Sequence, residues 1–400
     1  GDGTFEDVTA ASGLRAETLR FLEAGEGACS NRIHRPKLYG AAGLRETTTH
    51  GGHNPHVPST WNSPARSILA REDLPAAHPC NRREDKVLAR YLVTGAAGFI
   101  GRSISAALLE RGEQVRGVDN FITGKRHNLV GLEGIEFVEG DLSDPAVCAR
   151  VCQDIEIVFH EAALASVPRS VADPAGTNLH CVTATLNLLI AARDAGVRRV
   201  VYAGSSSAYG DTPTLPKHEG MLPNPISPYA VAKLAGEQYM RAFARVYGLQ
   251  TVVLRYFNVF GPYQDPTSHY SGVLAIFCRK MLAGEQPTIY GDGEQSRDFT
   301  YIENVVRANL LASEVPADKV SGQVMNCATG ARITLNDTFK ILCELTGYKG
   351  TILHSKPRSG DIKDSLADIS LAEQLIGYKP TVDFREGLRR TVDWYRASAQ

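Results

Sequence analysis

The 400-residue sequence lacks the features that mark membrane proteins and nucleic-acid-binding proteins. No run approaches the roughly 20 consecutive apolar residues of a membrane helix, and the first residues show no basic-then-apolar secretory pattern. We therefore expect a cytoplasmic protein without a membrane partner. The formal net charge is only −1, which removes the electrostatic reason to expect a nucleic-acid partner.

Signals for metal or redox chemistry are also missing. The eight cysteines are scattered and include no Cys-x-x-Cys pair. Cys148 and Cys152 share one face of an expected helix and are interpreted as buried free thiols. His50, His53 and His56 have no cysteine or carboxylate cluster beside them, so a solvated loop is favoured over a metal site. We predict no metal ion.

In the first 86 residues, apolar residues do not recur over any long stretch at the spacing of a strand, every 2 residues, or of a helix, every 3.6 residues. These residues are also rich in Gly, Pro, His, Ser and Thr. We expect this leader to be largely disordered, and its role is open. After Lys86, short β-branched runs alternate with amphipathic stretches, which predicts an α/β fold with a doubly wound parallel sheet of the Rossmann type. The predicted strands are 90–94, 114–119, 135–138, 155–160, 199–203 and 250–256, and the clearest predicted helices are 99–111, 178–195, 228–247, 335–345 and 384–397.

The segment VTGAAGFIG joins the first predicted strand to the first predicted helix. Its glycines, Gly95, Gly98 and Gly101, suit a tight turn that lets a pyrophosphate approach the backbone. The helix N-terminus that follows would face this anion. The segment predicts a dinucleotide site within an NAD-binding Rossmann domain over residues 87–260. Residues 261–400 are expected to form a smaller α/β lobe that mainly binds substrate, although some of its segments complete the Rossmann domain.

Acidic residues at the ends of the next two strands refine the cofactor prediction. Asp119, followed by Asn120, can accept hydrogen bonds from ribose hydroxyls and would repel a 2′-phosphate, so NAD is favoured over NADP. Asp141 and Leu142 form a turn that we interpret as a cradle for the adenine.

Tyr229 and Lys233 lie four residues apart and therefore on one helix face. A nearby ammonium favours the phenolate, and a cationic nicotinamide would add to this effect. Ser205, Ser206 and Ser207 follow the fifth predicted strand, where a doubly wound sheet opens its crevice. The pattern predicts hydride chemistry, with Tyr229 removing a proton from a sugar hydroxyl.

From about residue 87 onward the sequence resembles the nucleotide-sugar epimerases among the extended short-chain dehydrogenases, and it is most similar to UDP-N-acetylglucosamine 4-epimerases. The motifs that carry the resemblance arrive in the order of that family: TGAAGFIG, DNF, GDL, HEAALASVPRS, SSSAYG, PYAVAK, LRYFNVFGP, GDGEQSRDFTYIENV and RSGDI. The resemblance implies an isomerase that removes a hydride from C4 of a UDP-sugar and returns it to the opposite face.

The resemblance also implies residue roles. The catalytic residues would be Ser205, Tyr229 and Lys233, with Ser206 as a second hydroxyl near the sugar. Cofactor contacts would come from the glycine turn and the strand-end residues named above, from Tyr229 and Lys233, and from Phe99, Ile100, Ala162 and Ala163. Tyr256 would also contact the cofactor, near the nicotinamide. Substrate contacts would come from Ser166, Arg169, Ser205, Asn258, Arg297, Arg358, Asp361 and Ser365. Of these, Arg297 and Arg358 would contact the phosphates.

Several alternatives stay open within this resemblance. Dehydratases and decarboxylases of this fold carry carboxylates where this chain has Ser206 and Ser207, and a hydroxyl cannot replace a carboxylate base. The small Ser365 leaves room for an N-acetyl group, which favours UDP-N-acetylglucosamine as substrate, with UDP-glucose also possible. A UDP-glucuronate 4-epimerase and a non-catalytic NAD-binding sensor or scaffold are the alternatives.

The helices at 178–195 and 229–247 carry apolar residues on more than one face. We therefore expect a homodimer through a four-helix bundle, as is usual in the resembled family.

Overall fold

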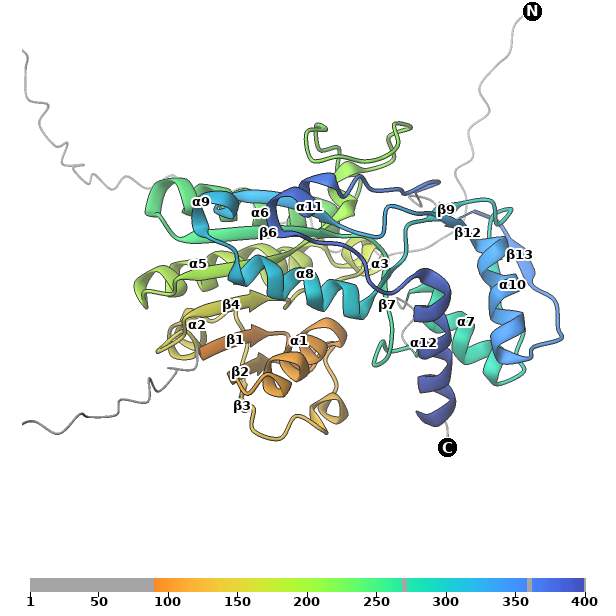
Figure 1. Ribbon diagram of the computed structural model, residues 1–400, viewed down its shortest axis with the longest axis horizontal. Helices are drawn as coiled ribbons and strands as arrows, with labels where there is room; N and C mark the ends of the chain where they lie inside the picture. Colours follow the sequence, from red (N-terminus) through yellow and green to blue (C-terminus); the bar gives the residue numbers. More distant parts are fainter. Residues whose placement is uncertain (1–89, 268–271, 358–361, 399–400) are drawn as a thin grey trace, which may run out of the picture. The chain divides into compact units, whose positions relative to one another are not determined.

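The computed structural model describes residues 90–267, 272–357 and 362–398 (Figure 1). The leader at 1–86, including His50, His53 and His56, lies outside these ranges, as do Arg358 and Asp361. None of the described helices is long and apolar enough to cross a membrane.

A seven-stranded parallel sheet forms the centre of the fold, and its strand order is β11-β6-β5-β4-β1-β2-β3. The order reverses between β1 and β4, which is where a doubly wound sheet opens a crevice at the carboxyl ends of its strands. The predicted fold class is confirmed. The strands are β1 (Arg90–Thr94), β2 (Gln114–Asp119), β3 (Glu136–Glu139), β4 (Ile157–His160), β5 (Arg199–Ser205), β6 (Gln250–Tyr256) and β11 (Gln323–Cys327).

Helices cover both faces of this sheet (Figure 1). Successive strand residues alternate between two hydrophobic clusters: Leu92 packs with one, and its neighbour Val93 packs with the other. Burial on both faces explains why the strands read as continuous apolar runs rather than alternating ones. One face carries α1 (Phe99–Glu110) and α8 (Ile302–Glu314), and the other carries α2 (Pro145–Val151), α5 (Ala184–Asp194) and α6 (Pro228–Tyr247).

The predicted helix at 178–195 needs correction, because it combines three elements. They are α4 (Pro174–Asn178), a π-helical turn, η2 (Leu179–Thr183), and α5. The helical stretch begins earlier because Asp173 accepts the backbone N–H of Gly176 at 2.9 Å and Pro174 occupies the first helical position. The third strand also lies one residue later than predicted, and β5 extends to Ser205. Cys148 and Cys152 are fully buried, as expected.

Apart from α8 and β11, which belong to the central sheet and its cover, the residues beyond β6 form a smaller group of helices and short strand pairs. The predicted helices in this region are present, with bounds that differ by one residue at their C-terminal ends. The elements are β7 (Val259–Phe260), α7 (Val273–Leu282), β8 (Thr288–Tyr290), β9 (Ser296–Arg297), β10 (Thr300–Tyr301), α9 (Ala317–Val320), β12 (Ile333–Thr334), α10 (Leu335–Thr346), β13 (Leu353–Ser355), α11 (Ser370–Ile376) and α12 (Phe384–Ser398). Short helical turns earlier in the chain are η1 (Arg126–Leu129), α3 (Val167–Ala172) and η3 (Ser206–Tyr209).

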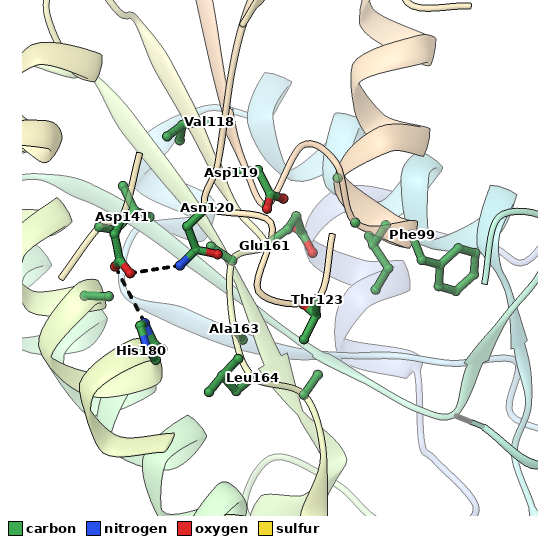
Figure 2. Close-up of a pocket in the computed structure, with 18 of the residues that line it drawn as sticks. Phe99, Val118, Asp119, Asn120, Thr123, Asp141, Glu161, Ala163, Leu164 and His180 are labelled. Carbon is green, nitrogen blue, oxygen red and sulfur yellow. Dashed lines mark hydrogen bonds and ion pairs between the residues drawn. The ribbon is translucent and has the colours of Figure 1, made fainter. Parts of the chain in front are cut away.

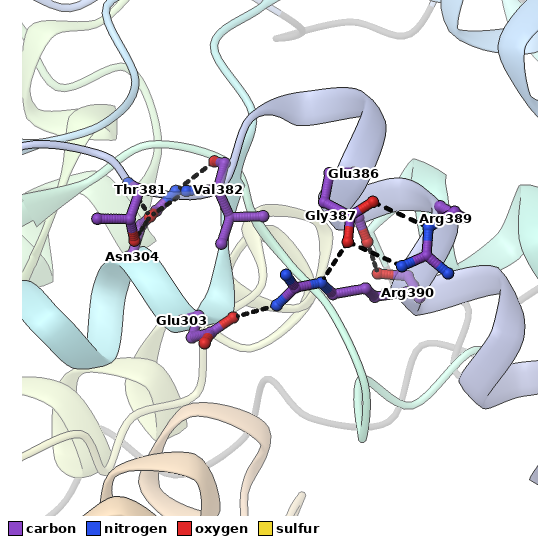
Figure 3. A network of polar contacts seen from close by, with 9 residues as sticks. Glu303, Asn304, Thr381, Val382, Glu386, Gly387, Arg389 and Arg390 are labelled. Atoms are coloured by element: carbon purple, nitrogen blue, oxygen red, sulfur yellow. Dashed lines mark hydrogen bonds and ion pairs between the residues drawn. The ribbon is translucent and has the colours of Figure 1, made fainter.

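The segment that leads into α12 is tied to α8 (Figure 3). The buried Asn304 accepts the backbone N–H groups of Thr381 and Val382 at 2.8 and 3.1 Å, and it donates to the Val382 carbonyl at 2.8 Å. Glu303 pairs with Arg390 at 2.7 Å on the surface nearby. The buried amide dominates this attachment because exposed ion pairs are screened by water.

Candidate active site

The glycine turn lines a groove at the carboxyl ends of the strands (Figure 2). Gly95 has φ +67°, and a Cβ on it would lie 2.9 Å from the backbone nitrogen of Ala162. A Cβ on Gly101 would lie 2.2 Å from the Gly95 carbonyl oxygen, so neither position accepts a side chain. The turn therefore presents bare backbone and the N-terminus of α1 to the groove, a combination that fits a pyrophosphate. Gly98, Phe99 and Ile100 also line it.

The acidic residues predicted to hold the adenosine lie in the same groove. Asp119 accepts the backbone N–H groups of Ala97 at 3.1 Å and Phe121 at 2.8 Å, which fix its carboxyl group. Burial raises the pKa of Asp119, although these amides oppose the rise. Asn120 donates to Asp141 at 2.9 Å, so the two predicted turns contact each other, and the neighbouring Leu142 also lines the groove.

A chain of hydrogen bonds fixes the loop after β4, which brings Ala162 and Ala163 to the groove. Thr94 accepts the Ala162 backbone N–H at 3.1 Å and lies 2.8 Å from His160, whose other ring nitrogen lies 2.9 Å from Thr185. Thr185 donates onward to the Cys181 carbonyl at 2.7 Å. Burial lowers the pKa of His160 to about 3, so the ring is neutral and holds the loop in place.

The structure brings Ser205, Tyr229 and Lys233 together. Ser205 ends β5, and its side chain lies close enough to the Tyr229 phenol to lower the pKa of that group. Tyr229 is the second residue of α6, which begins after Ser227 because the Ser227 hydroxyl accepts the Ala230 backbone N–H at 3.2 Å. Lys233 lies one turn further and is 4% exposed.

The pKa of Tyr229 differs in direction from the one that the sequence suggests. Burial raises the pKa of Tyr229, the Cys181 thiol adds to the rise, and the Ser205 side chain opposes it. Burial lowers the pKa of Lys233, and its ammonium group donates to the Ala203 carbonyl at 2.8 Å. The lowered Tyr229 pKa that the sequence suggests is therefore not present in the protein chain alone, because burial dominates and the opposing contribution comes from Ser205.

Ser206 and Ser207 occupy the single turn η3, which begins just after the Ser205 hydroxyl. Ser207 donates its hydroxyl to the Ser205 oxygen at 2.8 Å and its backbone N–H to the same oxygen at 3.2 Å. Sequence reasoning assigned the second hydroxyl to Ser206, which is half-buried in this turn, and it missed the contact that Ser207 makes.

The three predicted catalytic residues, Ser205, Tyr229 and Lys233, lie next to the groove. The backbone N–H of Leu164, a groove residue, donates to the Cys181 sulfur at 3.3 Å, and Cys181 raises the pKa of Tyr229. Glu161, another groove residue, raises the pKa of Lys233. A dinucleotide in the groove would therefore end beside Tyr229 and Lys233.

Sequence reasoning also missed Glu161, which follows β4 within the HEAAL motif. Its carboxyl group accepts the Tyr256 hydroxyl at 2.9 Å. Tyr256 ends β6 and is paired in register with Ser205 on β5. The residue predicted to lie near the nicotinamide thus contacts an acid that lines the groove.

Apart from Ser205, the described residues that were predicted to bind substrate fall into two places. Asn258 donates to the Ser365 hydroxyl oxygen at 3.1 Å and to the Asp298 carbonyl at 2.9 Å. Arg297, which precedes Asp298, donates to the backbone carbonyls of Ser296 and Lys363, each at 2.9 Å. At the second place Ser166 caps α3 by accepting the backbone N–H of Arg169 at 3.2 Å.

Asp298 organises the first of these places. Its buried carboxyl accepts the backbone N–H groups of Thr329, Gly330 and Ala367 at 3.0, 3.1 and 3.2 Å. The backbone N–H of Asp298 donates to the Ser365 hydroxyl at 3.2 Å. Ser365 is therefore held by two donors and is 8% exposed.

Comparison with known proteins places this geometry among related enzymes. Residues 91–328 match the model of the NAD dependent epimerase/dehydratase family. A putative UDP-glucose 4-epimerase of Methanocaldococcus jannaschii is 38% identical over 76% of this chain and 98% of its own length. A UDP-glucuronate 4-epimerase of Thermodesulfobacterium geofontis is 36% identical over 78% of this chain and 97% of its own.

Two solved structures are similar as well. The UDP-glucose 4-epimerase of Thermotoga maritima, solved with UDP-glucose, has 41% identity and a TM-score of 0.75, and the match covers 78% of this chain and 100% of that one. The UDP-N-acetylglucosamine 4-epimerase of Methanobrevibacter ruminantium, solved with UDP-N-acetylmuramic acid, has 41% identity and a TM-score of 0.74, covering 78% and 99%.

Proposed function

Because this chain belongs to the NAD dependent epimerase/dehydratase family, we propose that it interconverts a UDP-sugar and its C4 epimer. The chain is an isomerase and its cofactor is NAD. The observation that carries the proposal is the meeting of Ser205, at the end of β5, with Tyr229, at the start of α6, while Lys233 lies one helical turn further along α6.

Each of these residues has a distinct task in the proposed reaction. NAD bound in the groove would supply a hydride acceptor for C4 of the sugar and the hydride donor for its return to the opposite face. The Tyr229 phenolate takes the proton of the C4 hydroxyl, which makes it the neutral phenol, and later the phenol gives this proton back. The Ser205 hydroxyl bonds the same oxygen, and the buried ammonium of Lys233 favours the phenolate form that begins the cycle.

Epimerisation is favoured over dehydration because the turn after Ser205 offers hydroxyl groups and no carboxylate. Ser206 and Ser207 occupy η3, and the Ser207 hydroxyl is directed to Ser205. Removal of a C5 proton requires a basic group whose pKa lies near neutral pH, and a serine hydroxyl is not such a group.

We propose UDP-N-acetylglucosamine and UDP-N-acetylgalactosamine as the preferred pair. Ser365 contacts Asn258, so a small side chain stands beside a residue that the resemblance assigns to the substrate. A bulky residue there would occupy the space that an N-acetyl group needs. The similarity to a UDP-glucuronate 4-epimerase keeps UDP-glucuronate as the second candidate.

A product assay over UDP-N-acetylglucosamine, UDP-glucose and UDP-glucuronate tests the proposal, with NMR detection of each C4 epimer. We expect the fastest conversion with UDP-N-acetylglucosamine. Faster conversion of UDP-glucuronate would favour the second candidate. No conversion of any of the three with NAD bound would favour a sensor or scaffold.

We further propose a homodimer formed through η2, α5 and α6. These elements expose apolar side chains, including Leu179, Val231 and Val246 at 41%, 53% and 68%. Such a surface is costly in water and suits a second copy of the chain. Sedimentation that shows a monomer would contradict the dimer.

A further inference from the structure

One oxygen of the Glu161 carboxyl has no partner inside the cofactor groove (Figure 2). Oε1 accepts the Tyr256 hydroxyl at 2.9 Å. Oε2 is buried, and no hydrogen-bond partner reaches it from the residues at 90–267, 272–357 and 362–398. A buried carboxyl oxygen without a partner is costly, so a ligand group is expected to meet it.

The direction of the neighbouring hydrogen bonds shows where a carboxyl proton would lie. Asn309 donates from Nδ2 to the Val305 carbonyl at 2.9 Å and to the Tyr256 oxygen at 2.8 Å. The Tyr256 hydroxyl lies nearer to Glu161 Oε1, at 2.9 Å, than to Asn309 Oδ1, at 3.1 Å. Because Oε1 accepts this hydroxyl, a proton on the Glu161 carboxyl belongs on Oε2.

Burial favours the neutral form of Glu161, and the neighbouring ammonium of Lys233 only partly offsets it. Burial raises the pKa of Glu161 to about 7, while Tyr256 on β6 and Lys233 on α6 oppose the rise. The third titratable neighbour is Cys327 on β11, and burial raises the pKa of its thiol to about 12, so it is neutral. A Cβ on Gly95 would lie 3.2 Å from the Glu161 carbonyl carbon, so the backbone of Glu161 adjoins the pyrophosphate turn.

We propose that Glu161 binds the dinucleotide as a neutral carboxylic acid, donating from Oε2 to an oxygen of the cofactor. An ionised Glu161 must therefore take one proton from solvent when NAD binds. The inference rests on NAD binding and not on the identity of the sugar, so it can fail while the proposed epimerase activity holds.

Calorimetric titration of NAD into the full chain, freed of nucleotide, tests this inference in buffers of different ionisation enthalpy. The proton is held more tightly in the complex than in the free protein, so affinity is full below the free pKa and falls above it. We expect NAD affinity to fall about tenfold between about pH 6 and about pH 8, with nearly one proton taken up at the higher pH.

Glu161→Gln imitates the neutral acid and should bind NAD with nearly the same affinity at both pH values, without proton uptake. The control Glu156→Gln changes an exposed acid that pairs with Arg198 and should keep the wild-type pH dependence. His180, which lies 3.6 Å from Asp141 in the same groove, is the competing source of a pH effect.

Three results would overturn the inference. The first is no proton uptake by the wild-type chain at about pH 8, which needs no variant to fold. The second is a wild-type pH dependence that survives in Glu161→Gln and disappears in His180→Asn. The third is a Glu161→Gln variant with weaker affinity for NAD but unchanged affinity for NADH. This result would show that Glu161 is ionised and pairs with the nicotinamide cation.

Discussion

Ser207 donates its hydroxyl to Ser205 across 2.8 Å, so the Ser205 oxygen is already an acceptor before any substrate arrives. The same oxygen also accepts the Ser207 backbone N–H at 3.2 Å. With its acceptor side occupied, Ser205 has its own proton directed away from Ser207 and toward the Tyr229 side, where the sugar hydroxyl is expected.

We predict that Ser207→Ala lowers kcat about fivefold, since one neutral hydrogen bond contributes about 1 kcal/mol. The KM should change little because the lost contact orients Ser205 rather than the ground-state sugar. Ser313→Ala is a matched control, because that buried hydroxyl bonds the Leu310 carbonyl far from the site. Equal kcat values for wild type and Ser207→Ala would contradict the orienting role.

Tyr229→Phe should lower kcat by about 10²- to 10⁴-fold, the range for loss of a positioned acid–base group. NAD content should stay near the wild-type level, which absorbance of the released cofactor would measure. The control Tyr239→Phe lies on the same helix with its ring against the core and should keep full activity. A Tyr229→Phe variant with more than a tenth of wild-type kcat would exclude Tyr229 as the base.

The rate should rise with pH through the neutral range. Burial raises the pKa of Tyr229 above its usual value, and the reactive form is the deprotonated phenolate. Below the effective pKa of Tyr229 in the NAD-bound enzyme without substrate, kcat/KM should increase about tenfold per pH unit. A pH–rate profile that is flat or falling from about pH 6 to about pH 8 would contradict this assignment.

Ser365→Tyr should exclude the N-acetyl sugar selectively. Ser365 is 8% exposed and contacts Asn258, so a larger ring would occupy the adjoining space. We expect the ratio of kcat/KM for UDP-N-acetylglucosamine over UDP-glucose to fall at least about tenfold. UDP-glucose turnover serves as the internal control for folding, and Ser365→Gly should keep the wild-type ratio. An unchanged ratio in Ser365→Tyr would remove Ser365 from the specificity pocket.

Glu237→Ala should destabilise the fold strongly. Glu237 and Arg255 form a bidentate ion pair at 2.7 and 2.8 Å, and each side chain is 3% exposed. Removing one partner leaves a buried, uncompensated charge, which costs about 3 to 5 kcal/mol. Chemical denaturation would measure the loss, and the exposed pair of Glu386 and Arg389 provides a control in Glu386→Ala, with little expected change. A similar loss in both variants would contradict the burial argument.

The sequence by itself determined the features that depend on neighbouring residues. Strand and helix alternation, the glycine turn at 95–101 and the helix start at Ser227 are local, because periodicity, backbone freedom and capping act over a few residues. The placement of Tyr229 and Lys233 on one helix face follows from the helical repeat alone.

Only the tertiary structure decided which distant groups meet and how burial changes them. Glu161 and Tyr256 are 95 residues apart, and Asn258 and Ser365 are 107 apart, so no local pattern predicts either contact. The Tyr229 pKa was misjudged for the same reason: Lys233 is visible in the sequence, but the loss of water around the phenol arises only when β5, α6 and η2 pack together.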